Sequence, residues 1–129
     1  MFETGTARQV VSFHVMPDMP PPEGERHSHN YRLELVASRN ELDERGMVVD
    51  LDVLDGALGD LTNLLDGADL DKIAGPDLGT DAVTVEAFAM WVHGRISAAL
   101  GSVGGASLSV RVWESETMFG GYQAPLGSA

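Results

Sequence analysis

The sequence contains no cysteine and only eight lysine and arginine residues, against twenty aspartates and glutamates. Without cysteine, the chain can have no disulfides, thiolate metal ligands or thiol nucleophiles, so its chemistry must use other groups. A formal net charge of -12 argues against nucleic acid as a partner, because an acidic surface repels a phosphate backbone. No uninterrupted apolar stretch approaches the roughly 20 residues that span a membrane, and residues 1–7 show no signal-peptide pattern. We therefore expect a cytoplasmic protein with no membrane partner.

The composition that is present suits one globular domain. The 129 residues are 43% hydrophobic, which is enough for a modest core and gives no sign of a second domain. We treat residues 1–129 as a single domain.

Three of the four histidines lie close together in the sequence. In an extended strand, side chains alternate between faces, so His27 and His29 project from the same face. His14 ends an earlier strand-like run, at residues 9–13, and is the third candidate ligand. Imidazole nitrogen suits zinc, and three protein ligands with an open fourth position is the catalytic arrangement. The alternative is that these histidines are polar residues at strand ends, with no metal.

The remaining pattern predicts two helices and two further strands. Asp50 is the expected N-cap of a helix with an apolar stripe at Leu51, Leu54, Leu58, Leu61 and Leu65. Asp52 and Asp55 are expected on its solvated face. After a Gly- and Asp-rich connection over residues 66–83, Thr84 should cap a second helix that runs to about Leu100. His93 lies off the buried stripe of this helix and is expected to be exposed or at an interface.

A third strand over residues 107–114 alternates cleanly, and a fourth is expected over residues 117–123. Glu114 continues the apolar face of the third strand, so it is either the point where the strand emerges into water or a carboxylate held in a pocket. The order β-β-α-α-β-β predicts an α+β fold, with an antiparallel sheet and both helices on one face.

Ordered motifs along residues 10–122 carry a family resemblance. They are His14 at a strand end, His27-Ser28-His29, Gly46-Met47-Val48-Val49-Asp50, Leu65-Asp66-Gly67, Thr84-Val85-Glu86, and Glu114 followed by Tyr122. In these motifs the chain resembles the 6-pyruvoyl-tetrahydropterin synthase and 6-carboxy-tetrahydropterin synthase family.

The resemblance implies the tunnelling fold (T-fold), in which four-stranded sheets close into a barrel on oligomerisation. It further implies a homohexamer of two stacked trimers with sites at subunit interfaces. By the same resemblance, zinc bound to His14, His27 and His29 would acidify the side-chain hydroxyls of a reduced pterin. Glu114 would anchor the pterin ring, with Thr84 and Glu86 as further substrate-binding residues.

Departures from the family pattern bear on the chemistry. Glu23 stands where the family has its cysteine base, and Gly67 stands where it has a histidine, which leaves Asp66 alone. The loss of two groups that titrate near neutrality predicts weak or absent conversion of dihydroneopterin triphosphate. A subset of the family carries glutamate at the cysteine position and resembles an aldolase-type enzyme of folate synthesis. Glu23, or Glu25 two residues on, is the candidate base here, while Asp66 would only shape the pocket.

Three classes of function follow. The first is a zinc-dependent lyase acting on the side chain of a dihydropterin, either dihydroneopterin or its triphosphate. The second is a pterin-binding homologue that keeps zinc and the pterin anchor but has lost catalysis. The third is a structural oligomer in which the histidines fill a strand end. Phosphate elimination and carbon–carbon cleavage both stay open.

Overall fold

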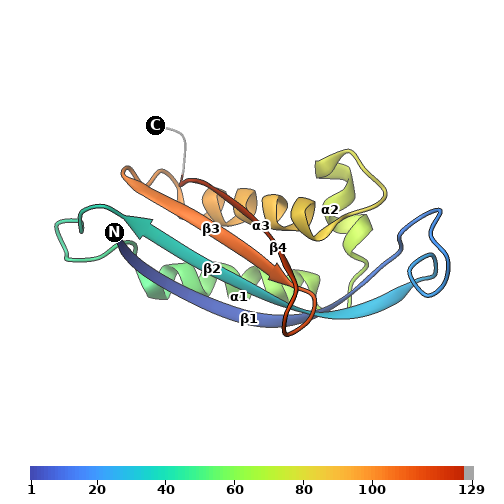
Figure 1. Cartoon of the computed structure of the whole chain (residues 1–129). Coiled ribbons are helices and arrows are strands. Elements are labelled where there is room, and N and C mark those ends of the chain that lie inside the picture. The colour runs from blue at the N-terminus through green and yellow to red at the C-terminus, as the bar shows by residue number, and fades with distance from the viewer. Residues whose placement is uncertain (127–129) are drawn as a thin grey trace.

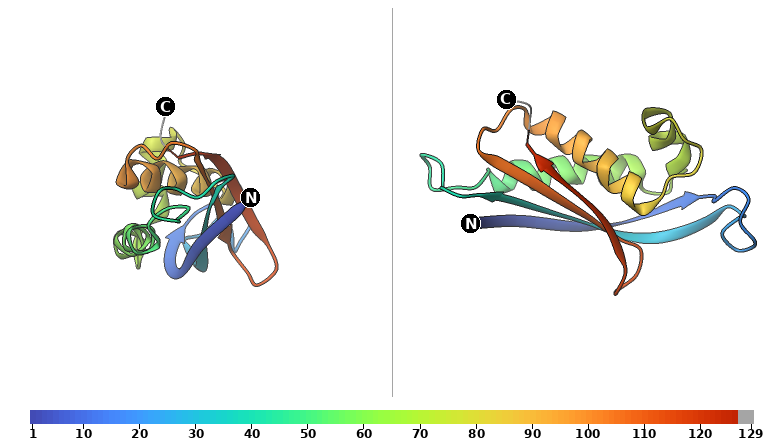
Figure 2. Two further views of the ribbon diagram at one scale, coloured as in Figure 1. Left: turned by 90° about the vertical axis from the view of Figure 1, so that its left-hand side faces the viewer. Right: turned by 45° about the horizontal axis from the view of Figure 1, so that its top comes forward.

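Four antiparallel strands form one sheet in the order β1-β2-β3-β4 (Figure 1). The computed structural model describes residues 1–126. The strands are β1 (Phe2–His14), β2 (His27–Arg39), β3 (Ala106–Trp113) and β4 (Phe119–Pro125). The helices are α1 (Leu51–Leu65), α2 (Leu70–Leu78) and α3 (Val85–Leu100). Helices α1 and α3 cover one face of the sheet, and α2 lies near the end where β1 stops (Figure 2). The predicted α+β class is confirmed.

The sheet and the helices enclose a single core. Burial alternates along β2 and β3, and the helix-facing side chains of these strands are Tyr31, Leu33, Leu35, Ala37, Ala106, Leu108, Val110 and Val112. The inner faces of α1 and α3 supply Leu54, Leu58, Leu65, Phe88, Val92 and Ile96. Burial of each large apolar side chain contributes about 1.5 to 3 kcal/mol. The alternation along β2 and β3 therefore determines which of their side chains point toward the helices.

The N-terminal caps of the two long helices are as predicted. Asp50 accepts hydrogen bonds from the backbone of Asp52 and Val53, and Thr84 accepts one from the backbone of Ala87. Each cap satisfies backbone donors that the first turn leaves without partners.

The prediction of two helices was wrong, because α2 lies inside the segment expected to be a loop. Gly75, Pro76 and Gly79 suggested irregular structure. The helix nevertheless forms, because Leu70 and Ala74 lie four residues apart and are both buried. Gly79 ends it in a left-handed conformation, with φ of 68°.

The predicted burial of three side chains also needs correction. Leu51 is 43% exposed, because it opens α1 before the apolar stripe meets the sheet. His93 is 6% exposed, because β4 passes over it and its Nε2 lies 3.0 Å from the carbonyl oxygen of Ala124. Asp55 faces β1 rather than solvent alone, since its carboxylate accepts hydrogen bonds from Thr6 and Arg8.

The strand boundaries differ from expectation in three strands, of which β4 is shifted to Phe119–Pro125 from the expected residues 117–123. Strand β1 begins at Phe2 rather than near Gln9, because pairing with β2 extends over its whole length. Strand β3 ends at Trp113, so Glu114 opens the turn toward β4. Within residues 1–126, no helix is long and apolar enough to cross a membrane. The cytoplasmic location stays a prediction.

Candidate functional site

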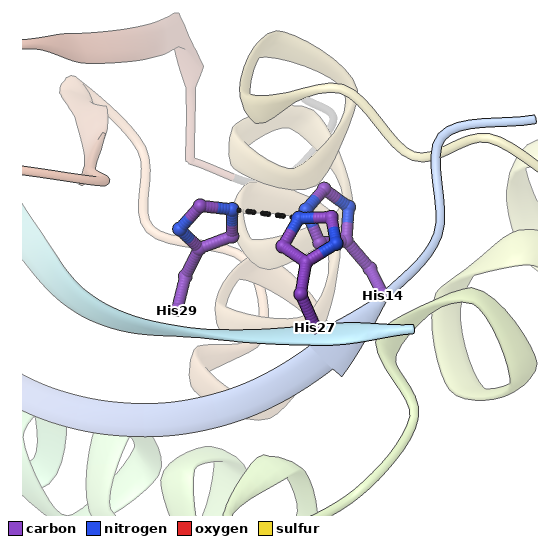
Figure 3. Close-up of side chains that lie close together, drawn as sticks. All are labelled: His14, His27 and His29. Atoms are coloured by element: carbon purple, nitrogen blue, oxygen red, sulfur yellow. Dashed lines mark hydrogen bonds between the residues drawn. The ribbon is translucent and has the colours of Figure 1, made fainter. Parts of the chain in front are cut away.

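Three histidines meet where β1 ends and β2 begins. In the antiparallel register His14 lies opposite His27, and Ser12 lies opposite His29. The three rings therefore project from the same side of the sheet, as Figure 3 shows. One ligand nitrogen from each ring can be chosen so that all lie within 4.8 Å of one another, and Nε2 of His27 lies 3.1 Å from Nε2 of His29.

The donor set fits a metal ion. Both ring nitrogens of His14 are buried and have no hydrogen-bond partner among residues 1–126, which is costly unless another group satisfies them. Nδ1 of His27 lies 2.7 Å from the carbonyl oxygen of Glu25; a proton on that nitrogen leaves Nε2 free as a ligand. A tetrahedral zinc with Zn–N bonds of about 2.05 Å spaces its ligand nitrogens about 3.3 Å apart. The 3.1 Å between the Nε2 atoms of His27 and His29 is close to that spacing.

The surroundings of His14 and His29 favour the form of the imidazole that binds metal. Burial first, and then the charges of the neighbouring histidines, lower the pKa of His14. Burial and His27 likewise lower the pKa of His29, while Glu114 and Glu23 act in the opposite direction. A lowered histidine pKa favours the neutral ring at neutral pH, and the neutral ring is the metal ligand.

The loop that precedes β2 holds Glu23 beside the histidines. The backbone N–H of Met16 donates to the carbonyl of Glu23 at 2.8 Å, and that of Gly24 donates to the carbonyl of Pro20 at 3.2 Å. At the end of the loop, the Nε of Arg26 donates to Asp69 at 2.7 Å. The loop is therefore fixed at both ends, although the Glu23 side chain itself is exposed in the single chain.

A partly buried pair of hydrogen bonds connects the end of β1 to the start of α3. The Asp71 carboxylate accepts hydrogen bonds from the backbone N–H of Val15, at 2.9 Å, and from that of Val83, at 3.2 Å. Val15 follows His14, and Val83 precedes Thr84. One side chain of α2 thus sets where the histidines stand relative to the N-terminus of α3.

The turn after β3 closes the other side of the site. The backbone N–H of Glu114 donates to the carbonyl of Met118 at 3.1 Å. Gly120 passes so close to α3 that an added Cβ would lie 2.6 Å from Val85 Cγ2 and 3.0 Å from Glu86 N. Glycine at this position therefore lets the β3–β4 turn pack against the helix start.

One cavity of about 370 Å³ collects seven of the eight residues predicted for the site. These are His14, Glu23, His27, His29, Thr84, Glu86 and Glu114. Sequence reasoning missed Met16, Val83, Val85, Ser115 and Met118, which also line it. The sequence gives no sign that these residues line a cavity, other than that they lie near predicted site residues.

Asp66 does not line this cavity. It follows the last residue of α1, and its carboxylate accepts a hydrogen bond from the backbone N–H of Val11 at 3.1 Å. Its side chain borders a separate hollow shared with Arg8 and Thr62. The adjacent Gly67 has φ of 73°, a left-handed conformation that other residues adopt only with strain.

Comparisons with known proteins agree with this architecture. A 6-pyruvoyl tetrahydropterin synthase from Caenorhabditis elegans is 18% identical, with a TM-score of 0.73 and 95% of each chain covered. The Plasmodium falciparum 6-pyruvoyl tetrahydropterin synthase is 14% identical, with a TM-score of 0.76, covering 96% of this chain and 98% of that one. A Plasmodium vivax catalytic-residue mutant, with alanine in place of glutamate, is 10% identical, with a TM-score of 0.71, covering 97% and 99%.

These structural similarities, at such low identity, show a shared fold. In a search of curated proteins, no sequence matches the chain. The family model described as 6-pyruvoyl tetrahydropterin synthase matches residues 7–125. The chain therefore belongs to the 6-pyruvoyl tetrahydropterin synthase family.

Proposed function

We propose that this protein is a zinc-dependent lyase that acts on the side chain of a dihydropterin, with Glu23 as the general base. One observation carries the proposal: the ring nitrogens of His14, buried and without partners, adjoin a cavity that Glu23 and Glu114 also line. Acid–base catalysis commonly takes place in a cavity that is lined by both metal ligands and carboxylates.

The side chains of the cavity have distinct roles in this proposal. When bound, zinc supplies Lewis acidity to the hydroxyls of the pterin side chain. Glu23 accepts the proton that a hydroxyl releases. Glu114 accepts hydrogen bonds from the amino-pyrimidine edge of the ring, and Thr84 and Glu86 border the same end of the cavity. The Plasmodium vivax protein supports a glutamate in the catalytic role, since its replaced glutamate is described as a catalytic residue.

A retro-aldol cleavage needs fewer proton relays than the reaction on the triphosphate. Glu23 takes the proton of the hydroxyl on the second side-chain carbon, and a carbonyl forms there as the bond to the first carbon breaks. The released electron pair moves into the ring imine and is then protonated at the first carbon. The reaction on the triphosphate instead requires a second group that returns protons to the opposite carbon of the side chain. Gly67 offers no side chain for that step.

A pterin-binding protein without catalysis is the second candidate. Two observations favour it: the Glu23 side chain is exposed in the single chain, and Asp66 lies outside the cavity. A general base usually works in a pocket that excludes water, and the single chain leaves this carboxylate open to solvent. Turnover by the metal-loaded protein separates the two candidates.

We further propose that the chain assembles as a homohexamer with sites at subunit interfaces. The outer edge of β4 has no strand partner among residues 1–126, and an open sheet edge is commonly covered or closed. Met118, Phe119 and Tyr122, around this edge, are 58%, 46% and 38% exposed. A second copy would cover these apolar side chains.

The first prediction concerns the metal. We expect one zinc per chain in the purified protein, and a loss of zinc in the His27→Ala/His29→Ala double variant, because two of three ligands are removed. The matched control is His93→Gln, which changes the histidine outside the cluster. Elemental analysis gives the answer, and equal zinc in the native protein and the double variant would refute the assignment.

The second prediction concerns the ring anchor. Glu114→Ala should weaken binding of a fluorescent reduced pterin at least tenfold, because hydrogen bonds to a charged acceptor contribute about 1.5 to 3 kcal/mol each. Glu116→Ala removes an equivalent acid two residues away that does not line the cavity. If the two variants bind the pterin equally well, Glu114 is not the anchor.

The third prediction concerns the base. Glu23→Gln should lower turnover of dihydroneopterin about 100-fold or more, since general-base catalysis typically contributes that much. Glu25→Gln is the comparison, because Glu25 does not line the cavity. Unchanged turnover in Glu23→Gln rejects Glu23 as the base. No turnover by the zinc-loaded native protein favours the binding protein instead.

The fourth prediction concerns assembly. Sedimentation at micromolar concentration should give a particle of six times the chain mass. Phe119→Lys should lower that mass, because it places charge among the apolar side chains that a second copy would cover. A stable monomer of the native protein contradicts both the hexamer and an interface site.

A further inference from the structure

A second cavity lies on the face of the sheet that points away from α1 and α3. Its volume is about 460 Å³, and its lining comes from β1, β2, β3 and the turn after β3. The strand register places Gln9, Arg32 and Trp113 side by side on three neighbouring strands. Each of these residues alternates with helix-facing neighbours, so their side chains project from the outer face. Among residues 1–126, the lining includes none from β4, the edge that a second copy would cover.

The indole of Trp113 carries a hydrogen-bond donor that lacks an acceptor. Its Nε1 is buried and has no partner among residues 1–126. The other tryptophan, Trp91, does have an acceptor, since its Nε1 donates to Asp77 at 2.8 Å. A buried donor without a partner is rare and costly, and a bound molecule commonly satisfies it. The cavity is therefore lined by an indole whose N–H can donate to an acceptor on a ligand.

Arg32, opposite Trp113 on the adjacent strand, has donors that its ion pair leaves available. Its guanidinium lies 3.6 Å from one carboxylate oxygen of Glu34, and that of Arg111 lies 3.8 Å from the other. Both distances exceed the length of a hydrogen bond, and one carboxylate cannot neutralise two guanidinium groups. Directly opposed side chains on adjacent strands start about 4.5 to 5.5 Å apart. Arg32 and Trp113 can therefore donate to the same edge of one molecule.

The turn after β3 adds acceptors to the same cavity. Glu114 and Glu116 line it, and both side chains are exposed. An ionised carboxylate only accepts hydrogen bonds, and it can take two from adjacent N–H groups. The side-chain amides of Gln9 and Asn30 can both donate and accept. A matched ligand therefore has acceptor atoms on one edge and adjacent N–H donors on another, whereas a simple anion would use the donors alone.

We propose that this second cavity binds a flat bicyclic ring with a 2-amino-4-oxopyrimidine edge, the edge that guanine and pterins share. The carbonyl oxygen and the nearby ring nitrogen accept from Arg32, as they do when arginine binds guanine, and Trp113 donates to the same acceptors. The ring N–H and the amino group donate to Glu116. The volume of the cavity lies within the range of small-molecule sites, and the indole offers the ring an aromatic contact.

This site is separate from the histidine cavity and does not depend on the proposed lyase activity. Glu114 and Ser115 border both cavities, whereas Gln9, Arg32 and Trp113 line only the second. The histidines project from the helix-facing side of the sheet, and the second cavity opens on the opposite side. Substitution of Arg32 therefore changes the second cavity and leaves the lining of the first intact.

Calorimetric titration of the zinc-loaded, assembled protein tests which ring is bound. Guanosine and neopterin carry the proposed edge, and adenosine does not. We expect guanosine to bind at least tenfold more tightly than adenosine, because adenine lacks the pair of adjacent N–H donors that a carboxylate accepts. Whichever of guanosine and neopterin binds this cavity more tightly identifies the source of the ring. Adenosine bound as tightly as guanosine overturns the inference.

Arg32→Ala assigns the binding to this cavity. We expect it to weaken binding of guanosine, and of a second equivalent of neopterin, at least tenfold, because it removes the charged donors. The matched control is Arg111→Ala, since Arg111 lies on the same face, shares Glu34 and is about equally exposed, but does not line the cavity. If neither ligand depends on Arg32, or if both variants weaken binding equally, the inference is wrong. A second copy that fills the cavity would give the first of these results.

The metal ligands provide the last control. The His27→Ala/His29→Ala double variant should bind guanosine as the native protein does, because these residues line the other cavity. Loss of guanosine binding together with zinc would place the nucleoside at the histidines and overturn the inference. Turnover of dihydroneopterin by a protein that binds no ring in the second cavity leaves the lyase proposal standing and rejects only this site.

Discussion

The antiparallel pairing of β1 with β2 determines where the metal ligands meet. Side chains alternate along each strand, so a shift of one residue would move His14 to the opposite face from His27 and His29. The same register places Val10 opposite Tyr31 on the helix-facing side. Core packing therefore also holds the histidines in place, and the site depends on the pairing of two strands.

Burial at this end of the sheet has two chemical effects. It lowers the pKa of His14 and His29, which favours the neutral imidazoles that a metal requires. It also raises the pKa of Tyr31, so that this phenol stays protonated beneath the rings. The carboxylates of Glu23, Glu86 and Glu114 are exposed by contrast, so the cavity combines partly buried imidazoles with solvent-exposed acids.

Local patterns in the sequence predicted much of the fold, and ordered motifs singled out seven residues that line one cavity. The caps at Asp50 and Thr84 and the alternation in β3 are local signals, and each appears in the structure. Helix α2 was missed because its burial depends on contacts with β1 and α3. These contacts cannot be predicted from a local stretch that contains glycine and proline. The burial of His93 depends on β4, whose path the sequence does not specify.

Asp71 has a consequence for how a bound molecule is recognised. Because its carboxylate ties the residue after His14 to the residue before Thr84, the histidines and the start of α3 stand at a set separation within one chain. A molecule that reaches both must span that separation, because a shift of either end would break a partly buried hydrogen bond to Asp71. The separation between the two ends of the cavity is therefore set by α2, a helix that contributes no residue to the lining.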